Sequence, residues 1–217
     1  MDSMISRRIG ITLRIVKASN YDEMRDSLSH DWELFLQKLN FFPIFIPNSL
    51  SDVESFLKEM EVDGLILSGG DNIGENKERD KTERKIIKFG ITYKIPIFGV
   101  CRGMQVLNDY FGGKLTMDDS IKHVENPHKI SLSSVKLQSI LEKDSFQVNS
   151  FHKNLIKKNQ LGKDLKLFAY CPTDMTVEGF IHKDYPIMGV MWHPERSGDI
   201  YNQKILQDFF KSKKTSA

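Results

Sequence analysis

In the first half of the chain, short apolar runs alternate with segments of helical periodicity. Residues 9–15 form an apolar run that predicts a β-strand. A second run, residues 42–46, ends at Pro47, and residues 51–54 match a capping box, which predicts a helix with Ser51 as its N-cap. Between these runs, apolar side chains recur every three or four residues and predict one face of a helix: Met24, Leu28, Trp32, Phe35 and Leu39.

The alternation of apolar runs with helical segments continues as far as Gly112 and Gly113. Residues 64–67 are apolar throughout, as in a strand that is buried on both faces. A charged helix is predicted over residues 77–93, a strand over 97–100, and then a helix that closes at Gly112 and Gly113. Strands and helices that alternate in this way are typical of a parallel sheet with helices on both faces.

The second half of the chain contains short strand-like runs with little helix between them. These runs are residues 129–132, 146–151, 165–170, 177–181 and 187–192. A final amphipathic helix is predicted over residues 200–211, and the tail, residues 213–217, is expected to fray. No repeat, low-complexity tract or flexible linker divides the chain, so we expect a single domain over residues 1–217.

Composition narrows the classes of function. The chain has 217 residues, 40% hydrophobic and 28% charged, and its 31 basic and 29 acidic residues give a formal charge of +2. Because no block of basic residues occurs, we expect no nucleic-acid partner. No apolar stretch approaches about 18 residues, so we expect no membrane span. Two cysteines, and no apolar leader over residues 1–8, predict a reducing, cytoplasmic location.

The strongest chemical signal is the segment from Gly99 to Gly103, with Cys101 at its centre. It lies where a predicted strand turns sharply into a helix, and it matches the G-x-nucleophile-x-G elbow with cysteine in place of serine. At a helix N-terminus the dipole favours the thiolate. Alternatively, Cys101 is a small buried hydrophobic residue and the glycines only shape a turn. The other cysteine, Cys171, has no neighbouring base and is interpreted as structural.

A nucleophile of this kind needs a base and an oxyanion site. His193 follows the last apolar run, so it should lie at the edge of the sheet where ligands bind, and Glu195 is placed to orient the imidazole. Gly69 and Gly70 follow another buried strand, and their N–H groups, with that of Arg102, are candidates for holding an oxyanion. A surface histidine and an ordinary turn are the alternatives. The remaining histidines lack metal-ligand spacing, so we expect no metal and no cofactor.

Together, these segments resemble the class I glutamine amidotransferase domains and, within that superfamily, the free-standing γ-glutamyl hydrolases. The resemblance covers the chain from about residue 9 to residue 210 and rests on six motifs: residues 67–70 (LSGG), 99–108 (GVCRGMQVLN), 112–115 (GGKL), 148–152 (VNSFH), 177–180 (VEGF) and 189–195 (GVMWHPE). It implies a flavodoxin-like α/β fold, with an open, mostly parallel sheet, helices on both faces and a small antiparallel extension.

The resemblance also implies roles for individual residues. Cys101 would attack a γ-glutamyl carbonyl, His193 would transfer the proton, and Glu195 would orient His193. The N–H groups of Gly70 and Arg102 would hold the oxyanion. The glutamyl group would be held by Gly69, Gln105, Ser150, Phe151 and His152. The expected partner is therefore a small-molecule γ-glutamyl substrate, hydrolysed through a cysteine thioester.

Three positions depart from the pattern of these hydrolases. Lys153 stands where a second histidine is usual, Met175 replaces a common glycine, and Met191 replaces a common glutamine. None of the three belongs to the proposed catalytic set. The departures therefore bear on the identity of the substrate and not on the chemistry.

The leaving amine is a separate question. Arg14, Lys17 and Arg25 follow the first predicted strand and suit an anionic leaving group such as a diphosphate, with solvated surface charge as the alternative. The short, Lys-rich chain is similar to hydrolases that release CDP-amidate in capsule biosynthesis, so γ-glutamyl-CDP-amidate is the specific substrate expected. The alternatives are an amide such as γ-glutamyl-aminobutyrate, a glutaminase subunit of an amidotransferase, and an inactive binding module. A homodimer is a further expectation.

Overall fold

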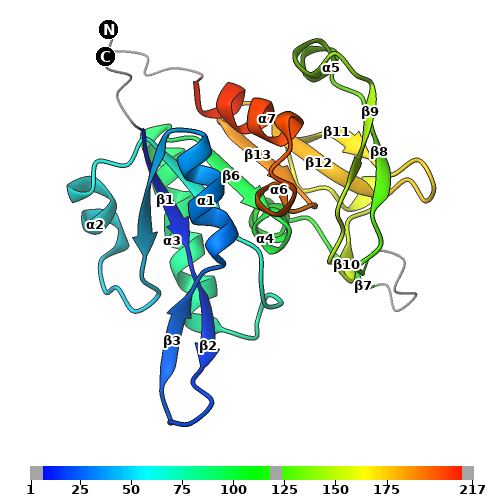
Figure 1. Ribbon diagram of the computed structural model, residues 1–217. Helices are drawn as coiled ribbons and strands as arrows, with labels where there is room; N and C mark the ends of the chain where they lie inside the picture. The colour runs from blue at the N-terminus through cyan, green and yellow to red at the C-terminus, as the bar shows by residue number, and fades with distance from the viewer. Residues whose placement is uncertain (1–6, 118–123, 212–217) are drawn as a thin grey trace, which may run out of the picture.

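The computed structural model describes residues 7–117 and 124–211 (Figure 1). Its centre is a nine-stranded sheet. In spatial order the strands are β4 (Phe41–Ile46), β1 (Arg7–Thr12), β5 (Gly64–Leu67), β6 (Ile97–Val100), β13 (Ile187–Val190), β12 (Val177–His182), β11 (Leu165–Tyr170), β8 (His128–Leu132) and β9 (Ser145–Val148).

The two halves of this sheet differ in strand direction. From β4 to β13 every neighbouring pair is parallel, and from β13 to β9 every pair is antiparallel. The strand β13 comes from near the end of the chain and lies parallel to β6. The residues that follow β13 are therefore close to the residues that follow β6. The expected α/β class is confirmed, and the antiparallel extension, which we expected to be small, has four strands.

Helices cover both faces of the parallel half of the sheet (Figure 1). On one face, α1 (His30–Lys38) and α7 (Ile200–Lys211) pack in a cluster that includes Ile66 of β5. On the other face, α2 (Val53–Glu59), α3 (Lys77–Tyr93) and α4 (Arg102–Tyr110) pack in a cluster that includes Leu65 and Leu67. Successive side chains of β5 therefore enter opposite cores, which explains why the strand is apolar throughout.

Several smaller elements surround the main sheet. The strands β2 (Arg14–Lys17) and β3 (Met24–Ser27) form an antiparallel hairpin that projects from the body in Figure 1, and β7 (Thr116–Met117) pairs with β10 (Asn154–Leu155). The remaining elements are α5 (Val135–Leu141), the 3-10 turn η1 (Lys158–Gln160) and α6 (Pro194–Ser197). Within the described residues, we find no helix that is both long and apolar enough to cross a membrane.

The structure corrects the prediction for the segment that precedes α1. The helix predicted from Met24 begins only at His30, because Ser29 is its N-cap and accepts a hydrogen bond from the Asp31 N–H at 3.3 Å. Met24 itself is 60% exposed on the β2–β3 hairpin, so its spacing to Leu28 does not mark a buried helix face. The helical periodicity corresponds to a helix only after the N-cap, Ser29.

Two further predicted boundaries change. The apolar run over residues 9–15 is divided between β1 and β2. The N-cap of α2 is Asp52 rather than Ser51, because the Asp52 carboxylate accepts a hydrogen bond from the Ser55 N–H at 3.0 Å. The predicted tail, residues 213–217, lies outside the described residues.

A network of buried charges joins α3 to α4 and to β1. The Glu83 carboxylate is fully buried and accepts hydrogen bonds from Arg79 Nε at 3.0 Å, from Thr12 Oγ1 at 3.0 Å and from Arg102. Arg102 also pairs with Asp80 at 2.5 Å. Burial lowers the pKa of Arg79, and the Glu83 charge opposes that shift. The Glu83 carboxylate on α3 is thus shared by two buried guanidinium groups, and Asp80 gives Arg102 a second partner.

Replacing Glu83 with glutamine should therefore destabilise the protein strongly. Glu83→Gln keeps the shape of the side chain but leaves two buried guanidinium groups without their shared countercharge, so we expect a loss of about 3–5 kcal/mol in the free energy of unfolding. Urea unfolding followed by circular dichroism measures this loss. As a control, Glu54→Gln breaks an exposed ion pair with Lys58 and should leave the unfolding midpoint unchanged. A wild-type midpoint for Glu83→Gln would contradict the role of the network.

Candidate active site

Cys101 lies in the turn between β6 and α4, where the backbone is strained. Its φ of 50° and ψ of −105° lie outside the regions that L-residues commonly adopt, and its N–H donates to the Val190 carbonyl at 2.8 Å. Close packing excludes side chains on either side of it. A Cβ at Gly103 would lie 2.0 Å from the Leu67 carbonyl oxygen, and one at Gly99 would lie 2.8 Å from the Gly103 backbone. The turn has the geometry that a nucleophile elbow requires.

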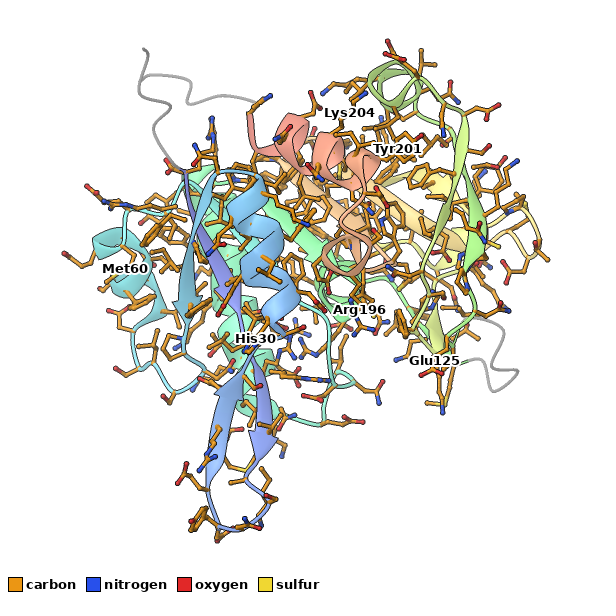
Figure 2. The ribbon with its side chains drawn as sticks, in the orientation of Figure 1. His30, Met60, Glu125, Arg196, Tyr201 and Lys204 are labelled. Carbon is orange, nitrogen blue, oxygen red and sulfur yellow. The ribbon has the colours of Figure 1, made fainter. Side chains whose placement is uncertain are left out.

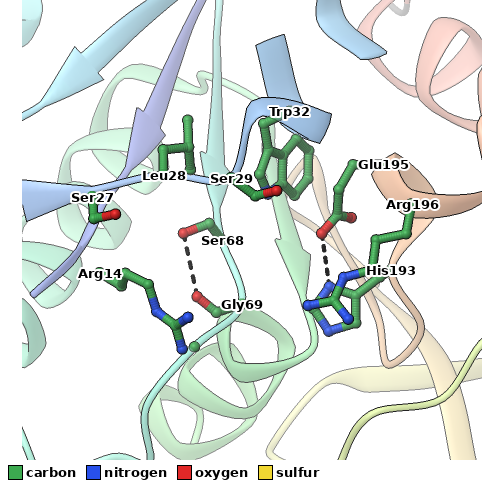
Figure 3. A pocket seen from close by; sticks show the side chains of 11 residues that line it. Arg14, Ser27, Leu28, Ser29, Trp32, Ser68, Gly69, His193, Glu195 and Arg196 are labelled. Carbon is green, nitrogen blue, oxygen red and sulfur yellow. Dashed lines mark hydrogen bonds and ion pairs between the residues drawn. The ribbon is translucent and has the colours of Figure 1, made fainter. Parts of the chain in front are cut away.

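His193 and Glu195 lie beside this turn because β13 runs parallel to β6. His193 Nδ1 donates a hydrogen bond to Glu195 Oε1 at 2.7 Å, and Figure 3 shows this carboxylate directed at the imidazole. Asn149 holds the backbone of His193 at two points. Its Oδ1 accepts from the His193 N–H at 2.9 Å, and its Nδ2 donates to the His193 carbonyl at 2.8 Å. The position of His193 and the orientation of its imidazole are therefore fixed.

The environment of His193 changes its protonation. Burial acts to lower its pKa, but the interactions of the protonated ring with the Cys101 sulfur and the Glu195 carboxylate outweigh burial and raise the pKa from 6.5 to about 9. The folded protein therefore holds the imidazole protonated at neutral pH. An imidazolium that lies beside Cys101 and is oriented by Glu195 can give a proton to a leaving group and take it back from water.

The loop after β5 passes directly beside His193. A Cβ at Gly69 would lie 2.6 Å from His193 Cε1, and a Cβ at Gly70, where φ is +135°, would lie 2.6 Å from Arg79 Nη1. Neither position has room for a side chain. Arg79 Nη2 fixes the loop, because it donates to the carbonyls of Ser68 at 2.9 Å and of Gly69 at 3.0 Å.

The oxyanion role expected of Arg102 is limited to its backbone. The guanidinium of Arg102 is buried and bound to Asp80 and Glu83, so it is not available to a substrate. Its N–H, by contrast, lies in the first turn of α4, directly after Cys101. Gly70 has no side chain and can offer only its N–H. The proposed oxyanion site therefore consists of two main-chain N–H groups.

Gln105, which we expect to hold the glutamyl group, is buried on α4. Its Nε2 donates to Met191 Sδ at 3.7 Å, and its Oε1 accepts from Asn154 Nδ2 at 3.4 Å. Asn154 also donates to Asn72 Oδ1 at 2.8 Å. The substitution at Met191 therefore contacts a residue of the expected glutamyl site. Met175, in contrast, is 60% exposed.

The segment from Ser150 to His152 also lies close to the catalytic set. Phe151 meets His193 edge-on, with ring centroids 5.8 Å apart, whereas Ser150 is buried. The His152 side chain is engaged elsewhere, because its Nδ1 donates to the Asn154 carbonyl at 3.2 Å and its Nε2 lies 3.9 Å from the Glu178 carboxylate. Of this segment, Phe151 is the residue whose side chain contacts a proposed catalytic group.

A cavity opens beside His193, and Figure 3 shows the side chains around it. Arg14, at the start of β2, lines this cavity together with Arg196. Arg25, which we also expected to contact substrate, does not line it; its exposed guanidinium pairs with Glu23 at 2.6 Å on the β2–β3 hairpin. The structure thus brings Arg14, but not Arg25, to the proposed catalytic residues.

Sequence reasoning missed four residues that shape the site: Asn149, Arg196, Arg79 and Glu83. Asn149 lies within the motif of residues 148–152 and Arg196 directly follows the motif of residues 189–195, so both positions carried an available signal. The last two have the i,i+4 spacing of a solvent-exposed ion pair in a charged helix, which does not distinguish a buried pair from an exposed one. Over residues 7–117 and 124–211, no cluster of three or more metal-ligating side chains is present.

Comparison with known proteins agrees with this geometry. The γ-glutamyl-CDP-amidate hydrolase of Campylobacter jejuni is 34% identical over 210 residues, which cover 93% of this chain and 96% of that one. A protein assigned as a GMP synthase component from Thermoplasma acidophilum superposes with a TM-score of 0.70 at 24% identity, over 95% of this chain and 93% of that one. A glutamine amidotransferase from Thermotoga maritima superposes with a TM-score of 0.68 at 15% identity, over 95% and 99%. The peptidase C26 family model matches residues 8–195, and the chain therefore belongs to the peptidase C26 family.

Proposed function

We propose that this protein hydrolyses γ-glutamyl-CDP-amidate to glutamate and CDP-amidate through a thioester on Cys101. The observation that carries the proposal is that Cys101, on its strained turn, lies beside His193, whose Nδ1 is hydrogen-bonded to Glu195. Family membership supports a hydrolase of γ-glutamyl amides. The specific substrate is supported by the Campylobacter jejuni relative, which is matched over nearly its whole length.

The first half of the reaction forms the thioester. Cys101 Sγ, whose proton is held by His193, attacks the side-chain carbonyl of the glutamyl group, and the carbonyl oxygen becomes negative beside the N–H groups of Gly70 and Arg102. When the C–N bond breaks, its electron pair stays on nitrogen. The His193 imidazolium supplies a proton to that nitrogen, so the amine leaves neutral and His193 becomes neutral as well.

The second half of the reaction releases glutamate. The neutral imidazole of His193 takes a proton from a water molecule, whose oxygen attacks the thioester carbonyl. The C–S bond then breaks, and its electron pair returns to Cys101 Sγ. The imidazolium beside the sulfur is restored, and one water has been consumed for each amide cleaved. Glu195 orients the imidazole in both halves through the Nδ1 hydrogen bond.

Removing the sulfur of Cys101 should abolish glutamate release. Because no thioester can form in Cys101→Ala, we expect kcat to fall by at least about 10³-fold. The measurement is glutamate released from γ-glutamyl-CDP-amidate by the purified chain. Cys171→Ala is the matched control: Cys171 is buried, burial raises the pKa of its thiol, and its removal should leave kcat within about twofold of wild type.

Equal release by wild type and Cys101→Ala would overturn the proposed mechanism. Free glutamine, assayed in parallel, separates the proposed hydrolase from a glutaminase subunit of an amidotransferase. A glutaminase subunit would prefer glutamine and would accelerate when a synthetase partner is added, whereas the proposed hydrolase needs no partner. A cytoplasmic location and a homodimer stay predictions.

The raised pKa of His193 predicts an alkaline limit to activity. His193 carries the proton for the leaving amine below pH of about 9 and loses it above, so kcat/KM should fall as the pH rises through 9. Glu195→Gln removes one of the groups that raise this pKa, so its alkaline limb should lie at lower pH than that of wild type. A pH-rate profile of both proteins measures the shift. An alkaline limb that does not move in Glu195→Gln would show that Glu195 does not act on the imidazole.

A further inference from the structure

The cavity beside His193 borders the group that would give a proton to the leaving nitrogen. The group attached to the leaving nitrogen must lie against the imidazole, because His193 gives its proton to that nitrogen. His193 and Glu195 form one wall of the cavity (Figure 3). Its other walls include Arg14 of β2, Ser27 of β3, Ser29 and Trp32 at the start of α1, and Arg196 of α6.

Gly69 lines this cavity, but the other residues expected to hold the glutamyl group do not. Gln105, Ser150 and His152 are buried and do not line this cavity. Gln105 is instead bound to Asn154 and contacts Met191. The two halves of a γ-glutamyl amide therefore have surroundings that meet at Gly69, and the cavity is on the side of the half that departs.

Arg196 has a position that suits it to bind an anion. Its guanidinium stacks on the Phe151 ring at 4.2 Å from the centroid, and Phe151 in turn meets the His193 ring edge-on. Arg196 is exposed, and no carboxylate in the described part of the chain forms an ion pair with it. Figure 2 shows Arg196 level with the end of α1 that begins at His30. The Arg196 guanidinium, held on the Phe151 ring and without a carboxylate partner in the described residues, thus lies close to His193, the proposed general acid.

Arg14 supplies a second cation, and in Figure 3 the two arginines stand on opposite sides of the cavity. Arg14 packs against Gly70, where its Nε would lie 3.3 Å from a Cβ, and its Nη2 is 3.5 Å from Asp71. Behind Gly70, the buried Nη1 of Arg79 has no hydrogen-bond acceptor in the described structure. Guanidinium groups bind phosphate oxygens in a bidentate manner, whereas the ammonia released from glutamine offers them no oxygen.

We infer that this cavity binds the phosphate groups of a leaving nucleoside diphosphate, with Arg14 and Arg196 as its specificity-determining residues. The inference rests on the proposed function. In a γ-glutamyl phosphoramidate the phosphorus is bonded directly to the leaving nitrogen. Its oxygens therefore lie next to the imidazole of His193, in the space that the two arginines border.

The test compares a phosphorylated and a neutral substrate in the full-length protein. γ-Glutamyl-CDP-amidate and γ-glutamyl methylamide share the glutamyl group, and only the first carries phosphates. In Arg196→Gln and in Arg14→Gln, the ratio of kcat/KM for the phosphorylated to that for the neutral substrate should fall about 10- to 100-fold. Arg84→Gln removes an exposed arginine that pairs with Asp109 outside the cavity, so it is the matched control and should leave the ratio unchanged.

Binding of CDP, measured by calorimetry, is a second readout that does not depend on turnover. Wild type should bind CDP, and Arg196→Gln should bind it at least about tenfold more weakly. An unchanged ratio and unchanged CDP binding in both variants, with wild-type hydrolysis intact, would overturn the subsite and leave the hydrolase function standing. Equal kcat/KM for the two substrates in wild type would also overturn it. If wild type releases glutamate from neither substrate, the proposed function itself fails.

Discussion

A buried carboxylate on α3 connects two parts of the site that are distant in the chain. Glu83 binds Arg79, which holds the carbonyls of the loop after β5, and it also binds Arg102, which follows the proposed nucleophile. Charges removed from water must be compensated where they lie, so the loop and the turn cannot separate without leaving a guanidinium unpaired. The relative position of the two N–H groups that would hold the oxyanion is therefore determined by ion pairs behind the site, and not by groups that touch the substrate.

The parts of the structure that follow from local chemistry could be predicted from the sequence. Gly99 and Gly103 flank a strained residue in a crowded turn. Because such a turn requires glycine at both positions, it can be recognised in the sequence as a five-residue pattern. The buried strand β5 is apolar throughout because both of its faces meet helices. The pairing of β13 with β6, which brings His193 to Cys101, joins segments about ninety residues apart. The rule for sheet edges predicted that His193 would lie at the ligand-binding edge, but it did not predict which strand would lie beside β6.

The parts that could not be predicted depend on contacts between distant segments. Met24 has the spacing of a helix face, yet it lies on a hairpin because the helix is capped at Ser29. Arg79 and Glu83 resemble an exposed pair, yet they are buried because α3 packs against the loop after β5. Periodicity reports which side of an element is apolar, but it does not report which polar side chains find a buried partner.

The hairpin of β2 and β3 forms a sheet of its own beside the nine-stranded one, and it presents Arg14 to the cavity from its first residue. The thiol, the imidazole and the charge network behind them belong to other elements. Natural selection can thus remodel this peripheral ribbon for a new leaving amine while the reacting groups stay as they are. Among proteins that differ mainly in this hairpin, the reaction would stay the same and the leaving amine would differ.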